Sequence, residues 1–318
     1  MNMLSTVRHR LAHSRFTAVL ILLAVIFVYF AVSQDGFFTL ANIRVMLASA
    51  SILWFVALGL TFVMIAGAYD LSLGSLLAMS GMAFGLFYQF AFGFAVGGAV
   101  NGFLVGRIGM PFLVVTLGTL TMYRGIVDLW SDGSTRGVTS SFLNALAFNN
   151  FLGVPVSVWV MLVALAISSY VLRSTYFGRD VYAVGGSADA ARLSGISVSR
   201  TLILVYAFAG AMSAIAGVLQ TARVGAVSPL VGETVIFEAT AAVVLGGTSF
   251  TGGAGSVAGT GVAVIFLATL SNGLATAGLE AAWQQVISGA ILIVALLVDI
   301  LRNGGWRMFL AKLRFRYS

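Results

Sequence analysis

The sequence contains no cysteine, two histidines and one lysine, and each shortage excludes a class of site. Without cysteine, neither a disulfide framework nor a thiolate metal site can form. His9 and His13 both precede the first long apolar run, so an imidazole metal site or proton relay within a membrane is excluded. Lys312 lies outside any glycine-rich loop, whereas a P-loop needs a lysine on the nucleotide phosphates. We therefore expect that this chain does not hydrolyse ATP.

Charged residues are also scarce. They make up 8% of the 318 residues, whereas 60% are hydrophobic. A soluble domain carries about a quarter charged residues, so this composition cannot cover a water-exposed surface. Apolar runs close to the ~20 residues that cross the hydrocarbon core recur along the chain, without the short alternating strands of a barrel. The sequence therefore predicts an all-α polytopic membrane protein with one transmembrane domain over residues 1–318.

About ten membrane-spanning helices are predicted. They cover residues 17–34, 46–67, 74–90, 91–106, 111–131, 153–172, 201–220, 234–249, 256–275 and 283–300. The 74–106 stretch is short for two spans and a connection near Gln89–Gly93, which suggests a lost or unrecorded loop. Counting it as one span would reverse the side of every later loop. Glycine-interrupted segments at Leu71–Ala78 and Gly253–Gly259 indicate pseudo-repeated halves with broken helices.

Basic residues set the predicted orientation. With the N-terminus in the cytoplasm, thirteen basic residues fall on inside segments, and only Arg44, Arg136 and Arg223 fall outside. We therefore expect both termini in the cytoplasm and the polar 132–152 segment outside as a loop. This asymmetry explains the formal charge of +7 without any nucleic-acid partner.

The longest predicted cytoplasmic segment covers residues 173–200. Within it, Ala188 to Leu193 are good helix formers, bracketed by Gly185-Gly186 and Gly195. The sequence therefore predicts a short helix between glycine breaks, placed to dock on a partner.

Acidic residues are few, and those within apolar runs are costly in hydrocarbon. Asp70 lies between two apolar runs, where its carboxylate could accept hydrogen bonds from the hydroxyl groups of a transported solute or cap the next helix. Glu238 lies in the eighth predicted span and should face the interior or a cavity. Arg124 and Asp128 have the spacing of an ion pair along one helix face.

Three motifs occur in order along the chain. They are Tyr69-Asp70-Leu71-Ser72-Leu73-Gly74-Ser75; Phe177-Gly178-Arg179 with Tyr182 to Ile196; and Ala241 to Ser249 with Gly252-Gly253 and Gly255-Ser256. Over about residues 15–300, the chain thereby resembles the permease subunits of bacterial ATP-binding-cassette (ABC) importers for ribose, xylose, arabinose, related sugars and autoinducer-2. It departs from that pattern at Tyr69, Ser187 and Ile236, which the family writes as isoleucine, asparagine and an acidic residue.

The resemblance implies that residues 187–196 form a coupling helix lying in a cleft of the ATPase. The residues assigned to this coupling are Gly185, Gly186, Ser187, Ala190, Ala191, Arg192, Ser194, Gly195 and Ile196. Ala190, Ala191, Ser194 and Gly195 are expected to be small because they pack against that partner. The candidate substrate-pathway residues are Asp70, Ser72, Ser75, Glu238, Thr248 and Ser249.

The resemblance also implies partners. They are separate ATPase subunits that bind ATP and Mg, a periplasmic sugar-binding protein, and a second, identical or different, permease chain in the bacterial inner membrane. The chain itself would then be no enzyme and would hold no cofactor or metal. An ABC permease for branched-chain amino acids or nucleosides stays an alternative. A proton- or sodium-coupled carrier would use Asp70 or Glu238 as its titrating group, and a non-transporting scaffold would have no need of broken helices.

Overall fold

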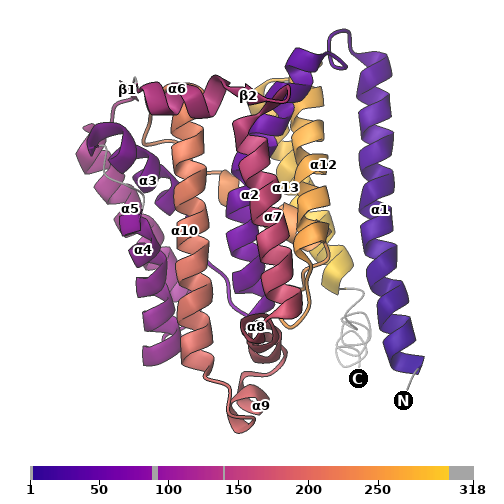
Figure 1. Ribbon diagram of the computed structural model, residues 1–318, viewed down its shortest axis with the longest axis vertical. Coiled ribbons are helices and arrows are strands. Elements are labelled where there is room, and N and C mark those ends of the chain that lie inside the picture. Colours follow the sequence, from indigo (N-terminus) through magenta and orange to yellow (C-terminus); the bar gives the residue numbers. More distant parts are fainter. Residues whose placement is uncertain (1–2, 88–91, 139, 301–318) are drawn as a thin grey trace, which may run out of the picture.

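The structure is a computed structural model that describes residues 3–87, 92–138 and 140–300 (Figure 1). Helices make up most of it: α1 (Met3–Ser33), α2 (Leu40–Ile65), α3 (Leu73–Phe87), α4 (Phe92–Phe103), the π-helix η1 (Leu104–Ile108), α5 (Phe112–Ser131), α6 (Ser141–Phe148), α7 (Val156–Ser174), α8 (Tyr176–Gly186), α9 (Ala188–Leu193), α10 (Val198–Val224), α11 (Val235–Leu245), α12 (Val257–Thr276) and α13 (Ala281–Ile300). Four two-residue strands form two antiparallel pairs, β1 (Arg136–Gly137) with β4 (Ala226–Val227) and β2 (Asn150–Phe151) with β3 (Val154–Pro155).

The predicted helical, polytopic architecture is confirmed, because each of the ten predicted stretches contains a helix. Six helices in the described part of the chain are long and apolar enough to cross a membrane, namely α2, α5, α7, α10, α12 and α13. By contrast, α3 and α11 have 15 and 11 residues. Their lengths of about 22 Å and 16 Å fall short of the ~30 Å hydrocarbon core. Ten complete spans therefore stay a prediction.

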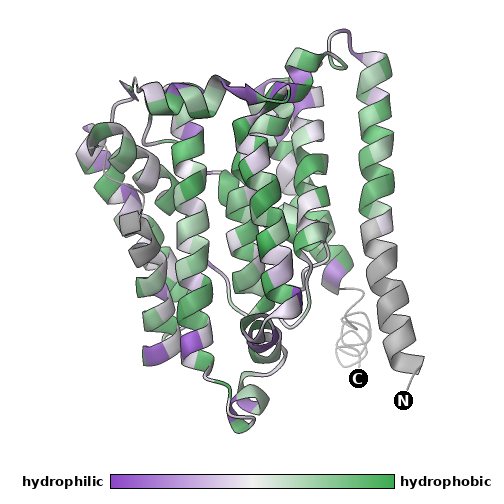
Figure 2. Cartoon of the chain, viewed as in Figure 1, coloured by the Kyte–Doolittle hydropathy of each residue, from purple (hydrophilic) through white to green (hydrophobic). Residues whose placement is uncertain are grey.

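Helix α2 forms the centre of the bundle. Every residue from Ala50 to Ile65 is buried, as expected of a helix that is apolar on all sides. Helix α10 packs against α2, α3 and α4, and α12 packs against α2 and α1. Hydrophobic residues run along most of the helices (Figure 2), and many large apolar side chains among them are exposed. In α13, most of the apolar stretch is not buried within the chain, which suits contact with lipid.

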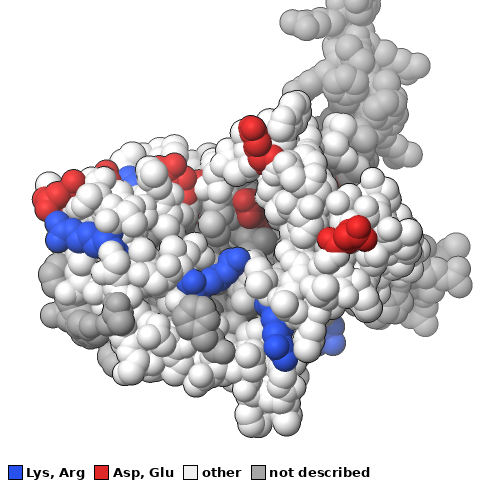
Figure 3. Space-filling model, turned by 90° about the horizontal axis from the view of Figure 1, so that it is seen from above, with Lys and Arg blue, Asp and Glu red and all other residues white. Residues whose placement is uncertain are grey.

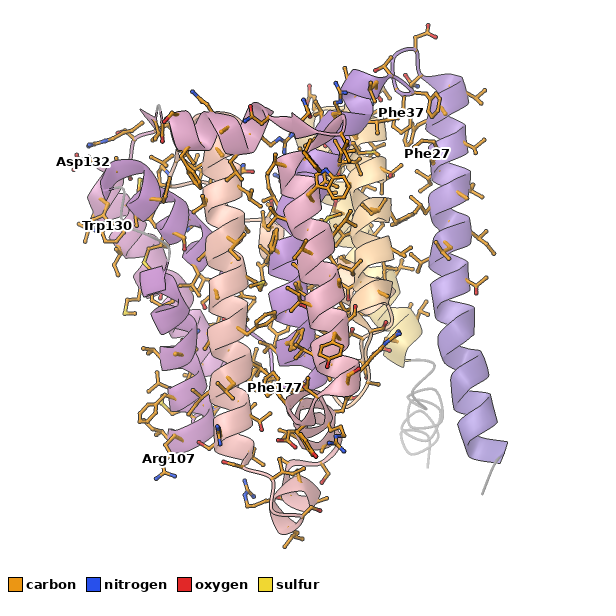
Figure 4. All side chains as sticks on the ribbon, viewed as in Figure 1. Phe27, Phe37, Arg107, Trp130, Asp132 and Phe177 are labelled. Atoms are coloured by element: carbon orange, nitrogen blue, oxygen red, sulfur yellow. The ribbon has the colours of Figure 1, made fainter. Side chains whose placement is uncertain are left out.

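The two ends of the bundle differ in what they carry. Arg107 lies at the same end as α8 and α9, whereas Trp130 and Asp132 lie at the opposite end (Figure 4). This arrangement agrees with the predicted grouping of inside and outside segments. The end opposite α9 carries both acidic and basic side chains, scattered among uncharged ones (Figure 3). Which end faces the cytoplasm stays a prediction.

Two connecting segments contain more structure than predicted. The 132–152 segment was expected to be a loop, but it contains α6 and the strands β1 and β2. The 173–200 segment contains α8 as well as α9. Helix α8 is only 11 residues long, too short for a membrane-span pattern, and begins where the Thr175 hydroxyl accepts a hydrogen bond from the Gly178 N–H at 3.2 Å. The predicted Gln89–Gly93 connection is described only at Phe92 and Gly93, which already belong to α4, and residues 88–91 lie outside the described residues.

Candidate functional site

Helix α9 begins and ends at the residues predicted for it, Ala188 and Leu193. At its start, the Ser187 hydroxyl accepts a hydrogen bond from the Ala190 N–H at 3.2 Å. Serine and asparagine are both favoured at this capping position, so the departure at Ser187 preserves the cap. At its end, the Gly195 N–H donates to the Arg192 carbonyl at 3.1 Å, and the Ile196 N–H donates to Ala191 at 3.0 Å. This is the Schellman arrangement, in which glycine adopts the left-handed conformation.

Most of the predicted coupling residues are exposed, but Gly185 and Ile196 are half-buried and Ala191 is buried. Ala190, Arg192 and Ser194 face outward, together with Leu193, whose side chain is 90% exposed. Ala191, however, is buried against Val184 of α8 and Val198 of α10. The expectation that Ala191 is small because it packs against a partner is therefore wrong for this residue, which seats α9 on its own chain.

The two glycines that precede α9 have different surroundings. A Cβ atom at Gly186 would meet nothing within 4 Å, whereas one at Gly185 would overlap the Ile65 carbonyl oxygen. Gly195 also has open space around it, and its φ of +83° explains the glycine. Backbone conformation is thus by itself a sufficient reason for glycine at position 195.

Asp70 and Ser72 meet Asn101 at the break between α2 and α3. The Asp70 carboxylate accepts hydrogen bonds from the Ser72 N–H at 2.9 Å and the Ser72 hydroxyl at 2.6 Å. The Asn101 side-chain amide of α4 donates to the Ser72 hydroxyl at 2.9 Å. All three residues are fully buried. Asp70 therefore shapes the turn that precedes α3 through its contacts with Ser72, whereas the helix that it was considered to cap begins only at Leu73.

Helix α10 supports the same break through two hydroxyl groups. The Tyr206 hydroxyl donates to the Tyr69 carbonyl at 3.0 Å, and the Ser213 hydroxyl donates to the Leu73 carbonyl. The Tyr69 hydroxyl lies within hydrogen-bonding distance of Thr240 in α11. The break is thus fixed to both α10 and α11.

The other pathway candidates lie on or beside α11, except Ser75, which is buried in α3. Thr248 and Ser249 follow α11 and are buried, and the two hydroxyls of Ser249 and Thr251 lie 2.9 Å apart. The neighbouring Phe250 ring packs against Tyr69 with ring centroids 5.6 Å apart. This contact brings the Asp70 and Ser249 segments together. Glu238 is only partly buried, on the first turn of α11.

The structure adds residues that sequence reasoning missed. Asn101 carried a usable signal, since an isolated polar residue in an apolar run predicts a buried polar partner. Tyr206 and Ser213 carried none, because their partners are backbone carbonyls far away in the sequence. Arg124 was expected to pair with Asp128, but its guanidinium donates to the carbonyl oxygens of Pro229 and Val231.

Residues 42–296 match the family described as "Branched-chain amino acid transport system / permease component". The chain is 34% identical to the ribose import permease protein of Bacillus subtilis, over 87% of this chain and 90% of that protein. It is 35% identical to the autoinducer 2 import system permease protein of Klebsiella pneumoniae, over 86% and 83%. It is 31% identical to the L-arabinose transport system permease protein of Escherichia coli, over 88% and 89%. No solved structure matches the chain.

Proposed function

The chain belongs to the family of branched-chain amino acid transport system permease components, and we propose that it imports a monosaccharide as the membrane-spanning subunit of an ABC transporter. The observation that carries the sugar assignment is the similarity to ribose and arabinose permeases along nearly the whole chain. The chain is accordingly a transport component and a multi-pass protein of the inner membrane.

We place the contact with the ATPase on α9. ATP and Mg bind to that separate subunit, because this chain lacks a P-loop lysine. Leu193 at the tip of α9 leaves 90% of its apolar side chain exposed, which suits insertion into an apolar cleft. Asp189 and Arg192 form an exposed ion pair at 2.9 Å beside it, which adds little stability by itself.

We place the sugar pathway along the outward face of α11, between two permease chains. Phe237 in the first turn of α11 and Glu233 in the turn that precedes the helix are both exposed, and the partly buried Glu238 adjoins Phe237. The buried hydroxyls of Ser72, Ser75, Thr248 and Ser249 lie at or beside the two helix breaks, one between α2 and α3 and the other between α11 and α12. A sugar would reach them when the breaks move, after a periplasmic binding protein has delivered it.

The function is tested by uptake into proteoliposomes that contain the chain, its ATPase subunit and its binding protein. Radiolabelled ribose, xylose, arabinose, leucine and adenosine serve as probes. We expect uptake of a sugar that requires ATP and survives collapse of the proton gradient. Uptake of leucine or adenosine would instead support the amino acid or nucleoside alternative. Uptake that follows the proton gradient without ATP would establish a secondary carrier.

The docking assignment is tested separately by replacing Leu193. Leu193→Arg should abolish co-purification of the ATPase subunit, because a charge would be forced into an apolar cleft. Phe142→Arg is the matched control, since Phe142 is an exposed apolar residue of α6 at the opposite end of the bundle. Equal recovery of the ATPase subunit with both variants would contradict docking through α9.

A further inference from the structure

Three distant segments of backbone meet where α8 ends. We call this contact the glycine junction; it consists of Gly67, Gly185, Gly252 and Gly253. The Gly253 N–H donates to the Ile65 carbonyl, the last residue of α2, at 2.9 Å. A Cβ atom at Gly252 would lie 2.6 Å from the Gly67 Cα atom and 2.8 Å from the Gly185 carbonyl oxygen. The end of α8 therefore touches the segment after α2 and the segment before α12 at once.

Gly185 is glycine for reasons of space. A Cβ atom there would overlap the Ile65 carbonyl oxygen and lie 2.6 Å from the Gly253 nitrogen. Both atoms belong to backbone, so neither can turn away as a flexible side chain would. Within a helix, alanine is favoured over glycine by about 1 kcal/mol, so the close approach outweighs that preference.

Tyr182 attaches the same face of α8 three residues earlier. Its hydroxyl donates to the Gly255 carbonyl at 2.9 Å. Burial raises the pKa of the Tyr182 phenol, with the nearby Arg173 charge acting in the opposite direction, so the phenol keeps its proton and remains a donor. Helix α8 is thereby held by a side-chain hydrogen bond as well as by the glycine junction.

The segments at the junction lead to both helix breaks. Gly67 continues into Tyr69, Asp70 and Ser72, and Gly252 follows Thr248 and Ser249. On the other side, α8 is separated from α9 only by Ser187, which ends one helix and caps the next. A displacement of α9 therefore has a short path through α8 to both breaks.

We infer that Gly185 and Tyr182 are positioning residues that transmit the movement of α9 to the two helix breaks. This inference rests on the proposed function, since it assumes that an ATPase moves α9. Neither residue belongs to the docking surface around Leu193: Gly185, which the resemblance assigns to ATPase coupling, contacts Ile65 and Gly253 of its own chain, and Tyr182 contacts Gly255. Their replacement should therefore uncouple transport from ATP hydrolysis while the ATPase subunit stays bound.

The first test compares Gly185→Ala and Tyr182→Phe with the native chain in the reconstituted complex. The measured quantities are recovery of the ATPase subunit and sugar transported per ATP hydrolysed. We expect full recovery and a loss of about tenfold in sugar per ATP for Gly185→Ala, with a smaller loss for Tyr182→Phe. Gly118→Ala and Tyr170→Phe are the controls, because Gly118 has open space around it and Tyr170 is exposed.

The second test does not depend on which solute is carried. Hydrogen exchange is measured on the complex in nanodiscs, at the backbone amides of residues 66–72 and 249–255. Gly185→Ala and Tyr182→Phe should speed exchange in both segments, whereas the two controls should not. Failure to transport any probe would overturn the proposed function. The exchange comparison would still show whether Gly185 and Tyr182 hold the two segments at the glycine junction. Tyr182→Phe removes only one hydroxyl and decides the outcome. If its hydrogen exchange is native and, where transport occurs, its sugar-to-ATP ratio is native as well, this inference is overturned.

Discussion

At the level of single residues, α9 depends on one capping residue at each end. Ser187 caps its start, and Gly195 closes its end in the left-handed conformation with a φ of +83°. Six residues make too short a helix to persist without such caps. The caps therefore fix how Leu193 is presented.

Replacement of Gly195 tests this dependence. Gly195→Ala should destabilise the end of α9 by about 1 kcal/mol, because alanine resists the left-handed conformation. Gly195→Asn should lose less stability at the end of α9, since asparagine tolerates the left-handed conformation. Hydrogen exchange at the amides of Ser194, Gly195 and Ile196 measures the difference. Native exchange in Gly195→Ala would show that the cap does not limit α9.

Asp70 offers a prediction that separates its two considered roles. Asp70→Ala should lower the stability of the chain by about 2–3 kcal/mol, because it leaves the buried Ser72 N–H without its acceptor. Asp70→Asn retains an acceptor and should lose less. Thermal unfolding of the purified protein measures the change.

The control for Asp70 is Ser80→Ala, which removes a buried hydroxyl that donates to the Leu76 carbonyl of its own helix α3. If Asp70→Ala has the same unfolding temperature as the native chain but no longer supports uptake, the carboxylate contributes to sugar transport rather than to stability.

At the level of elements, the loop before α11 is fixed by hydrogen bonds from a side chain of α5. Arg124 donates to the carbonyl oxygens of Pro229 and Val231, the latter at 3.0 Å. The same loop meets α3, because a Cβ atom at Gly232 would overlap the Gly74 carbonyl oxygen. Helix α11 therefore starts from a fixed point although it is short.

Arg124→Met should release this loop while keeping the length of the apolar side chain. The loss of charge-assisted hydrogen bonds should speed hydrogen exchange at residues 230–233 by about tenfold or more, since each such bond contributes about 1.5–3 kcal/mol and about 1.4 kcal/mol is a factor of ten. Arg124→Lys should give an intermediate result, because lysine offers one compact donor group. Unchanged exchange in the methionine variant would show that Gly232 alone fixes the loop.

At the level of the whole molecule, the absence of cysteine allows the orientation to be measured directly. Ala190→Cys and Thr135→Cys place single thiols on exposed residues at opposite ends of the bundle. With α9 in the cytoplasm, an impermeant maleimide should label Thr135→Cys in spheroplasts and Ala190→Cys only in inverted vesicles. The reverse pattern would overturn the orientation predicted from the basic residues.

The sequence was sufficient for features that follow from local pattern. Apolar length located ten helical stretches, and glycine brackets located α9. The short helices α6 and α8 were not predicted from the sequence, because they lack the apolar length of a membrane span. The burial of Ala191 and the contact between Gly185 and Ile65 escaped because they depend on how distant segments pack.

The glycine junction also restricts how this chain can evolve. Its contacts run from backbone to backbone, so no neighbouring side chain can be shortened to make room for a methyl group at Gly185. A lesion there should have no compensating substitution among its contact residues, and only reversion to glycine would restore it. Under the docking proposed for α9, the Leu193 surface could change together with the ATPase subunit, while the internal linkage to the helix breaks would stay fixed.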